Sequence, residues 1–511
     1  MNDQAIVTAD DWAEPAEQDP APAPSGVGVY GIIGRVLGVV ACVTVAALGW
    51  TVWNSGVVPT TWFVIGVGAL TAVALLVTIG LWSVNHQRHP VGYTLLVLLA
   101  VLGIIVNLVG SSAARNVTNL FEGIQAPQTL TDHYDVIALK THDPDVASLA
   151  GQAVAQLSTD AHKAEVTEKL AEIVSVNLGE VSDPGTLAQQ ITDGTLDGAV
   201  INSAYRSIYE DGMPEFYESI QILTTFDITY EAPTPTPEPE PAPDATTEER
   251  GNPAGSFIVY VSGVDVAGSI TATSRSDSNI LIVVNPTAGK ILMVNTPRDF
   301  YVQLHGTTGL KDKLTHAGIY GVDMSVSTLE DLYGVHIDDW IRVNFTSLVE
   351  LVDTLGGITV DSAYDFTCTH GGYHFSVGPN DMNGTEALCF SRTRYAFAEG
   401  DRIRGENQER VIEGILKKML DPSVLPRYAS ILDTLSGMMQ TSMPTDRIAQ
   451  LANNQLSSGK GYSFDLTSVT GSDAYAPTYS FGAQDLYVMI PDQGSVAIAK
   501  QRIEAVYYAM G

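Results

Sequence analysis

The stretch SNILIVVNPTAGKILMVNTPRDF, residues 278–300, contains two apolar runs separated by a turn, and it closes on a proline and an arginine. The runs ILIVV and ILMVN are rich in β-branched and other large apolar residues, as in strands buried inside a sheet. The connection NPTAGK contains Pro and Gly, which favour a turn. We therefore predict a β-hairpin in a domain core, with Arg298 just beyond the end of its second strand.

Strand and helix patterns alternate on both sides of this hairpin. FIVYV at residues 257–261 and DWIRVNF at residues 339–345 indicate further strands. Apolar residues at helical spacing mark residues 324–334 and 346–357. This alternation predicts an α/β (α+β) domain over residues 256–511, with a central mixed β-sheet flanked by helices.

Residues 125–230 show the same alternation and predict a small accessory α/β domain. DVIAL at residues 135–139 and GAVIN at residues 198–202 indicate buried strands, and residues 161–175 repeat apolar side chains at helical spacing. This region contains no catalytic constellation, so we expect a spacer or an interaction role. Residues 231–255 have proline at nearly every second position, which predicts an extended, stiff linker.

The amino-terminal part has the composition of a membrane anchor. Residues 30–120 contain no Asp or Glu, and their only basic residues are Arg35, Arg88 and Arg115. Three apolar runs span residues 36–53, 62–82 and 93–109. Each approaches the ~20 residues that a helix needs to cross a bilayer. We therefore predict three transmembrane helices within residues 30–115, rather than buried helices of a large soluble domain.

The flanking charges predict an orientation for this anchor. Residues 1–29 carry six acidic and no basic residues among many Pro and Ala, which predicts a disordered tail. The loop NHQRHP after the second apolar run contains Arg88, whereas the loop after the first carries no charge. The positive-inside rule then places the tail in the cytoplasm and everything after Arg115 outside the cell membrane.

Basic side chains are scarce, yet one segment concentrates them. The chain has 26 Lys and Arg against 58 Asp and Glu, a net charge of −32, which argues against nucleic-acid binding. Residues 389–411, CFSRTRYAFAEGDRIRGENQERV, nevertheless hold five arginines. These arginines either form solvated salt bridges with Glu399, Glu406 and Glu409 or converge on an anion.

The spacing within this segment, taken together with arginines at two predicted strand ends, favours an anion site. On a helix, Asp401, Arg404 and Gln408 share one face near the amino terminus. The apolar residues that continue this helix are Val411, Ile412, Ile415, Leu416 and Met419. Arg275 and Asp277 also precede a buried strand and Arg298 follows one, and strand ends are where α/β folds assemble their sites.

Between about residues 257 and 420 the chain contains seven motifs: SGVD, SRSDSNILIVVNP, ILMVNTPRDFYV, DKLTHAGIYG, LVDTLGGITV, NDMNGTEALCFSRTR and GDRIRGENQERVIEGILKK. In order and spacing, these motifs resemble the LytR–CpsA–Psr family. The resemblance implies an extracytoplasmic phosphotransferase of a Gram-positive bacterium. Such an enzyme moves an anionic glycopolymer from a polyprenyl-pyrophosphate carrier onto peptidoglycan and releases polyprenyl phosphate.

The resemblance also implies roles for individual residues. The catalytic, pyrophosphate-clamping arginines would be Arg275, Arg298, Arg392, Arg394 and Arg404, with Gln408 beside them. Asp265 and Asp277 would hold Mg²⁺ or Mn²⁺, and Asp401 would have a structural or proton-accepting role in the same pocket. Asn407 stands where many family members have Arg, so we leave it out of the site.

We also consider two alternative functions and expect one disulfide. The same arginines would serve a protein that holds polyprenyl phosphates without turnover, or a sensor. A transcriptional regulator is disfavoured by the wholly acidic tail. Cys368 and Cys389 lie in the proposed external part, where oxidation is permitted, so we predict a disulfide between them rather than two buried thiols.

Overall fold

The computed structural model describes residues 28–55, 60–124, 129–231, 255–264, 273–369, 371–394, 396–397, 400–421, 424, 431, 439–444, 447 and 461–510. The expected disordered tail lies outside these residues up to position 27, as do positions 232–254 of the expected linker. Two compact units make up the chain. The first comprises Met1–Asn54 and Thr60–Ala113, and the second comprises Ser55–Pro59 and Ala114–Gly511.

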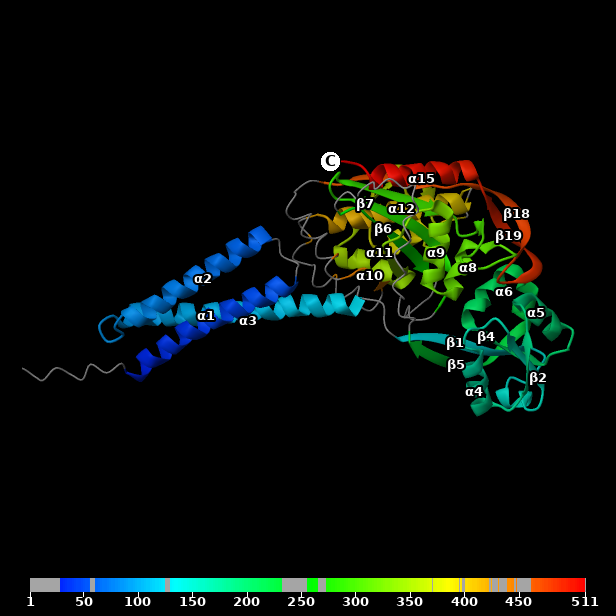
Figure 1. The fold of residues 1–511 in the computed structure, drawn as a ribbon, viewed down its shortest axis with the longest axis horizontal. Helices are drawn as coiled ribbons and strands as arrows, with labels where there is room; N and C mark the ends of the chain where they lie inside the picture. The colour runs from blue at the N-terminus through cyan, green and yellow to red at the C-terminus, as the bar shows by residue number, and fades with distance from the viewer. Residues whose placement is uncertain are drawn as a thin grey trace, which may run out of the picture. The chain divides into compact units, whose positions relative to one another are not determined.

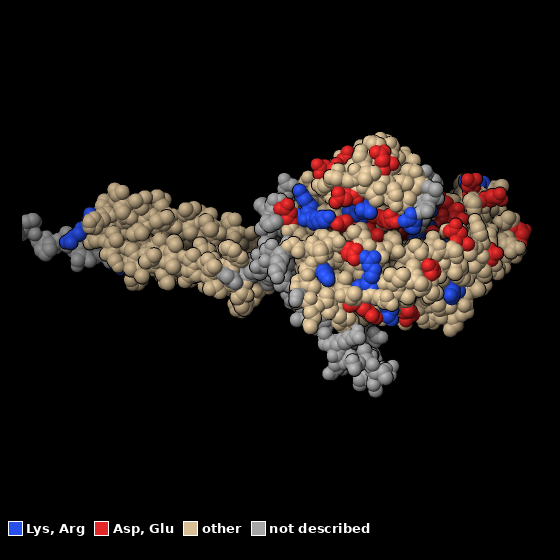
Figure 2. All heavy atoms as spheres, turned by 90° about the horizontal axis from the view of Figure 1, so that it is seen from above, with Lys and Arg blue, Asp and Glu red and all other residues tan. Residues whose placement is uncertain are grey.

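Three long helices, α1 (Val29–Ser55), α2 (Thr60–Ser83) and α3 (Pro90–Ile124), account for the first apolar region. Each contains a segment long and apolar enough to cross a membrane: Val29–Asn54, Trp62–Ser83 and Pro90–Arg115. Most of their large apolar side chains are exposed, and Figure 2 shows almost no charged residue along this part. By length and composition, these helices form a membrane anchor.

The accessory domain is a five-stranded mixed sheet in the order β3-β2-β4-β1-β5. Its strands are β1 (Thr129–Leu139), β2 (Ala153–Leu157), β3 (Asn177–Val181), β4 (Gly198–Asn202) and β5 (Ile220–Glu231). Its helices are η1 (Val146–Leu149), α4 (Lys163–Ile173), α5 (Pro184–Thr192), η2 (Ser203–Tyr205), α6 (Arg206–Gly212) and α7 (Pro214–Ser219). The predicted strands lie in β1 and β4, and the predicted helix is α4.

A six-stranded mixed sheet in the order β16-β11-β6-β7-β8-β17 forms the centre of the larger domain. Its strands are β6 (Phe257–Val264), β7 (Ser276–Asn285), β8 (Lys290–Thr296), β11 (Asp339–Asn344), β16 (Met439–Thr441) and β17 (Ser463–Ser468). The predicted hairpin is the antiparallel pair β7–β8, with Asn279 opposite Thr296. β11 pairs with β6, and β17 with β8, in parallel.

Both faces of this sheet are buried, which explains why the hairpin runs are continuously apolar. Leu281 and Val283 of β7 pack with helices α9 (Val322–Tyr333) and α15 (Gln493–Tyr507) on one face. Their neighbours Ile280 and Ile282 belong to a second cluster on the other face, against helix α12 (Gly400–Met419). The α/β fold expected from the sequence is therefore present, with helices on both sides of a mixed sheet (Figure 1).

Helix α12 lies between the sheet and a further layer. Ile412 and Leu416 face the sheet cluster, whereas Val411 and Ile415 pack into a core with α10 (Phe345–Leu355) and α11 (Gly384–Arg392). Strands β12 (Ile358–Ser362), β13 (Phe366–Thr367), β14 (His374–Phe375) and β15 (Gly378–Met382) belong to this layer. The apolar face expected on α12 thus divides into two inward faces.

The predicted disulfide joins Cys368 to Cys389, with 6.0 Å between their Cα atoms. Cys389 lies on α11, a helix that begins with a capping box formed by Asn383 and Glu386. The bond joins two cysteines that are 21 positions apart in the chain. One end of α11 is therefore fixed by its cap, and its middle is fixed by a covalent bond.

The accessory domain and the larger domain share a hydrophobic core. The antiparallel hairpin β18 (Gly471–Thr478) and β19 (Gly482–Pro491) contributes Phe481 and Leu486 to a cluster that is otherwise built mainly from accessory-domain side chains, Tyr209 among them. The amide of Gly185 donates to the carbonyl of Phe481 over 3.2 Å. The remaining short elements are β9 (Tyr301–Val302), β10 (Asp312–Lys313), α8 (Leu314–Ala317) and η3 (Gly318–Tyr320). The accessory domain therefore packs directly against the larger domain.

Candidate anion-binding site

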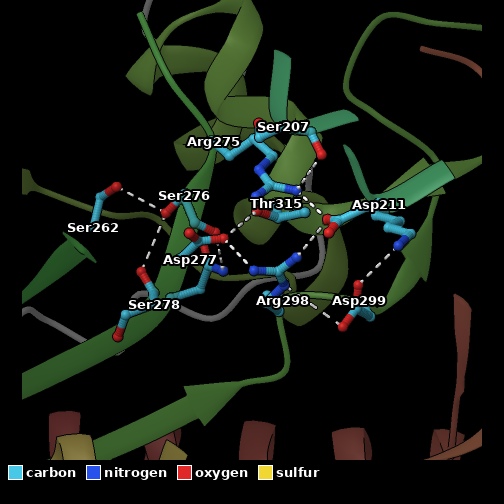
Figure 3. Close-up of polar contacts among 12 residues, drawn as sticks. Ser207, Asp211, Ser262, Arg275, Ser276, Asp277, Ser278, Arg298, Asp299 and Thr315 are labelled. Carbon is cyan, nitrogen blue, oxygen red and sulfur yellow. Dashed lines mark hydrogen bonds and ion pairs between the residues drawn. The ribbon is translucent and has the colours of Figure 1, made fainter. Parts of the chain in front are cut away.

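Arg275 and Arg298 meet because the hairpin brings their strand ends together. Arg275 immediately precedes β7, and Arg298 lies two residues beyond β8. These strands are antiparallel neighbours, so the start of β7 lies beside the end of β8. Figure 3 shows both guanidinium groups pointing into one polar cluster. Their side chains are 13% and 10% exposed, so most of their surface is withdrawn from water.

One carboxylate oxygen accepts hydrogen bonds from both arginines. Nη2 of Arg298 donates to Oδ2 of Asp211 over 3.1 Å, and Nη1 of Arg275 donates to the same oxygen. Nη1 of Arg275 also donates to the carbonyl of Ser207 over 3.3 Å. Ser207 and Asp211 both belong to α6 of the accessory domain. Sequence analysis missed Asp211, because no local pattern connects it with arginines 64 and 87 positions away.

Asp277 lies on the other side of Arg298. Its Oδ1 accepts from Nη1 of Arg298 over 2.6 Å and from the hydroxyl of Thr315 over 3.2 Å. The amide of Thr315 in turn donates to the carbonyl of Arg298 over 2.8 Å. Asp277 is only 9% exposed. The predicted residues Arg298 and Asp277 are therefore in direct contact.

A buried ion pair supports this arrangement from behind. Nζ of Lys313 lies 3.1 Å from Oδ1 of Asp299, and Nε of Arg298 lies 3.6 Å from Oδ2 of the same carboxylate. Burial raises the pKa of Asp299, but the charges of Lys313 and Arg298 outweigh this effect and keep the pKa below its usual range. Asp299 therefore stays ionised and restrains Arg298.

A second buried carboxylate fixes the adjoining segment. Asp312 accepts from the Ser480 amide over 2.7 Å and from the Ser480 hydroxyl, and it lies 2.7 Å from Nδ1 of His316. Asp312 and His316 are 0% and 1% exposed. The motif DKLTHAGIYG supplies Asp312, Lys313, Thr315 and His316, to which sequence analysis gave no individual roles.

The remaining arginines lie on α11 and α12. Arg392 is the last residue of α11, and Arg394 lies two positions beyond it. Arg404 and Gln408 lie half-buried on α12. A Cβ atom at Gly405 would lie 2.1 Å from Nδ2 of Asn295, so α12 passes directly over the end of β8. Since Arg298 follows β8, Arg404 and Arg298 belong to the same end of the sheet. Asp401 lies in α12, but its side chain falls outside the described residues.

Arg402 and Glu409 differ in their environments. Arg402 donates to Oε1 of Glu406 four residues along α12, as expected of a solvated salt bridge. Glu409 is 1% exposed and accepts from the Ser468 hydroxyl over 3.1 Å. Burial raises the pKa of Glu409 well above its usual range. The salt-bridge interpretation therefore holds for Arg402 and Glu406, but Glu409 lies inside the fold and not on a solvated face.

Asn407 has a structural role in α12. It is 0% exposed, and its Nδ2 donates to the carbonyl of Phe390 over 3.3 Å. Phe390 belongs to α11, so this bond joins the two helices that carry the second group of arginines. Leaving Asn407 out of the candidate site agrees with this position.

Of the two expected metal ligands, Asp277 lies among the described residues. Asp265 lies outside the described residues, and within them no group of three His, Cys, Asp or Glu side chains could hold a metal. β6 ends at Val264, which pairs with Ser276, so the chain leaves β6 beside Asp277. The Asp277 carboxylate and the Thr315 hydroxyl are hard oxygen donors of the kind that Mg²⁺ prefers. The donors present fit such an ion.

Formal charges in the described cluster balance. Arg275, Arg298 and Lys313 are opposed by Asp211, Asp277 and Asp299. Burial raises the pKa of Asp211, but Arg275 and Arg298 outweigh it, and the pKa lies below its usual range. A polyanion that binds here therefore competes with these carboxylates for Arg275 and Arg298.

Known proteins resemble this chain mainly in the larger domain. The model of the LytR_cpsA_psr family matches residues 224–507. The polyisoprenyl-teichoic acid–peptidoglycan teichoic acid transferase TagU of Enterococcus faecalis is 34% identical over 198 residues, which cover 38% of this chain and 64% of that protein. TagU of Bacillus licheniformis is 37% identical over 191 residues, which cover 37% and 61%.

A solved structure also resembles this chain. The crystal structure of B. subtilis TagV shares 28% sequence identity, with a TM-score of 0.42, and covers 50% of this chain and 98% of that chain. The chain spans less than two thirds of the length of the two TagU transferases. The family match, in contrast, covers more than half of the 511 residues. This chain therefore belongs to the LytR–CpsA–Psr family.

Proposed function

We propose that the protein is a membrane-anchored phosphotransferase that moves an anionic glycopolymer from a polyprenyl-pyrophosphate carrier onto peptidoglycan. The convergence of Arg275 and Arg298 on a single carboxylate oxygen carries this proposal, because two guanidinium groups aimed at one oxygen suit a phosphate. Family membership supports it, as do the names of two relatives, both teichoic acid transferases.

The chemistry needs alignment and charge stabilisation. A hydroxyl of the peptidoglycan acceptor attacks the phosphorus that bears the glycopolymer, the P–O–P bond breaks, and polyprenyl phosphate leaves. Arg275 and Arg298 would hold the non-bridging oxygens and stabilise the charge that grows on the leaving phosphate. Arg392, Arg394, Arg404 and Gln408 would complete this clamp from α11 and α12. Asp401 would accept the acceptor's proton or support the pocket.

Asp277, together with Asp265, would hold Mg²⁺ or Mn²⁺ in this site. The ion would supply further positive charge to the pyrophosphate. Thr315 and Arg298 orient Asp277 through its Oδ1 atom.

The location follows from the anchor. We propose that α1, α2 and α3 each span the cell membrane, with the amino terminus in the cytoplasm and both α/β domains outside. A cysteine placed within residues 238–244 should react with an impermeant maleimide on intact cells. Labelling that requires lysis would contradict this orientation.

The transfer itself can be tested with the full chain in detergent. A short glycan on a polyprenyl pyrophosphate and a peptidoglycan fragment should yield polyprenyl phosphate and a new phosphodiester. Arg298→Ala should abolish this product, whereas Arg502→Ala should not, because Arg502 of α15 donates to Asp465 of β17 and has no recorded contact with Arg275 or Arg298. Binding of the carrier without product in the wild type would identify a non-catalytic binding or sensor protein instead.

A further inference from the structure

Helix α6 of the accessory domain forms one wall of the arginine site. A Cβ atom at Gly212, the residue after Asp211, would lie 2.6 Å from Cδ2 of Leu486, so α6 packs closely against the β18–β19 hairpin. A larger residue at position 212 would require the Leu486 side chain to shift. Asp211 therefore reaches the arginines from a backbone that is held in place by apolar packing.

A second contact fixes the domains beside Arg275. Asp132, only 4% exposed, accepts from the amide of Thr273 over 3.2 Å and from its hydroxyl over 2.8 Å. Asp132 belongs to β1 of the accessory domain, and Thr273 lies two residues before Arg275. The accessory domain thus contacts the larger domain at two separate places beside the site.

Asp211 differs from the other carboxylates of the site. Asp277 is also bound by Thr315, and Asp299 is also paired with Lys313. In contrast, within the described part of the chain, only Arg275 and Arg298 donate hydrogen bonds to Asp211. Its side chain is 40% exposed, against 9% for Asp277 and 6% for Asp299. Asp211 is therefore the carboxylate that can leave the arginines with the least disruption.

We infer that Asp211 is a specificity-determining residue of the transfer site, whose carboxylate occupies the place of a phosphate oxygen and is displaced when the carrier's pyrophosphate binds. This inference rests on the proposed function. The displaced carboxylate is free to turn toward water, because α6 ends at the next residue and the side chain is partly exposed. Its return to the arginines favours release of the polyprenyl phosphate product.

This arrangement selects ligands by charge. A weak monoanion gains little by replacing a carboxylate that is already bound by two guanidinium groups. A pyrophosphate offers more oxygens and more charge, so it gains contacts that Asp211 alone cannot make. The accessory domain would in this way suppress occupation of the site by common anions.

The test compares two variants that make the same change in charge on the same helix. Asp211→Asn removes the competing carboxylate, and Glu210→Gln neutralises its exposed neighbour, for which the structure records no contact with the arginines. Binding of inorganic pyrophosphate to the full chain in detergent would be measured by calorimetry, with and without Mg²⁺. Asp211→Asn should tighten binding by roughly five-fold, the size expected for a partly exposed ion pair, and Glu210→Gln by less than about two-fold.

Steady-state kinetics of the transfer reaction distinguish the proposed role of Asp211 from a purely structural one. Asp211→Asn should lower KM for the lipid-linked substrate more than it changes kcat, and Asp211→Glu should restore wild-type behaviour. Unchanged or weaker pyrophosphate binding by Asp211→Asn would overturn the inference, because a carboxylate that merely positions the arginines aids binding. If the wild type and Arg298→Ala bind pyrophosphate equally, the proposed site fails and this inference fails with it. Binding that depends on Arg298 but not on Asp211 contradicts the inference alone.

Discussion

Arg275 and Arg298 are neutralised in a different way from Arg402. Arg275 and Arg298, at the β7–β8 ends, are opposed by carboxylates that include Asp211 from another domain. Arg402 on α12 is opposed by Glu406, four residues away on the same helix. The first arrangement exists only in the assembled fold, whereas the second forms wherever the helix forms. An arginine that needs distant partners is the better candidate for a ligand-binding role.

The largest effect expected from this comparison is on Arg298. Arg298→Ala should reduce transfer by at least about 100-fold, the cost of removing one donor that stabilises developing charge. Arg298→Lys should restore little activity, because an ammonium group cannot reproduce the two-pronged contact. Initial rates of polyprenyl phosphate release would measure both variants. If circular dichroism shows instead that Arg298→Ala unfolds the domain, the arginine serves stability and not ligand binding.

The disulfide fixes α11, the helix that carries Arg392. Replacing Cys368 and Cys389 together by Ser should lower the free energy of unfolding by about 3 kcal/mol, the chain-entropy value for a loop of this size. Chemical denaturation would measure the change. Alkylation of denatured protein should modify both cysteines only after reduction. Alkylation of both without reduction would show that the bond does not form in the cell.

Glu409 should give a pH-dependent effect. Because burial raises its pKa in the folded state above the unfolded value, protonation is favoured by folding, and stability is lost as pH rises toward the folded-state pKa. Glu409→Gln should therefore match the wild type near pH 4 and melt a few degrees higher near pH 8. Thermal unfolding across this range would measure the difference. A gap between the two proteins that stays constant with pH would contradict the assignment.

The smallest effect is expected at Arg402. Arg402→Gln removes a partly exposed pair between positions four apart on a helix, which contributes about 0.3–0.5 kcal/mol. Transfer should remain near the wild-type rate. Denaturant titration and the same rate assay would measure both quantities. A large loss of transfer would place Arg402 in the anion site and remove the distinction between the two groups.

Sequence patterns predicted what depends on local order. The structure contains the β7–β8 hairpin predicted from its apolar runs. It also contains the predicted helix over Gly400–Met419 and the predicted disulfide between Cys368 and Cys389. The hairpin also explains why Arg275 and Arg298 meet, although they are far apart in the chain. Asp265 and the side chain of Asp401 lie outside the described residues, so their roles stay predictions.

Contacts between the domains could not be predicted. Asp211 reaches Arg275 across 64 positions, and Asp132 reaches Thr273 across 141. A lone acidic residue in an acidic chain carries no signal of its partner. The division of the α12 apolar face into two likewise depends on which layers flank the helix. Such information resides in the packing of the whole fold.

The core shared by the two α/β domains has a practical consequence for anyone who shortens this protein. A product that begins at residue 255 would lack the accessory side chains that cover Phe481 and Leu486. The uncovered apolar surface would favour self-association. Because each domain completes the other, heating should melt both in one cooperative step rather than in two. We therefore expect the smallest part of these two domains that folds without the three long helices to begin before β1, and a transfer of the accessory domain to another protein would have to include the β18–β19 hairpin.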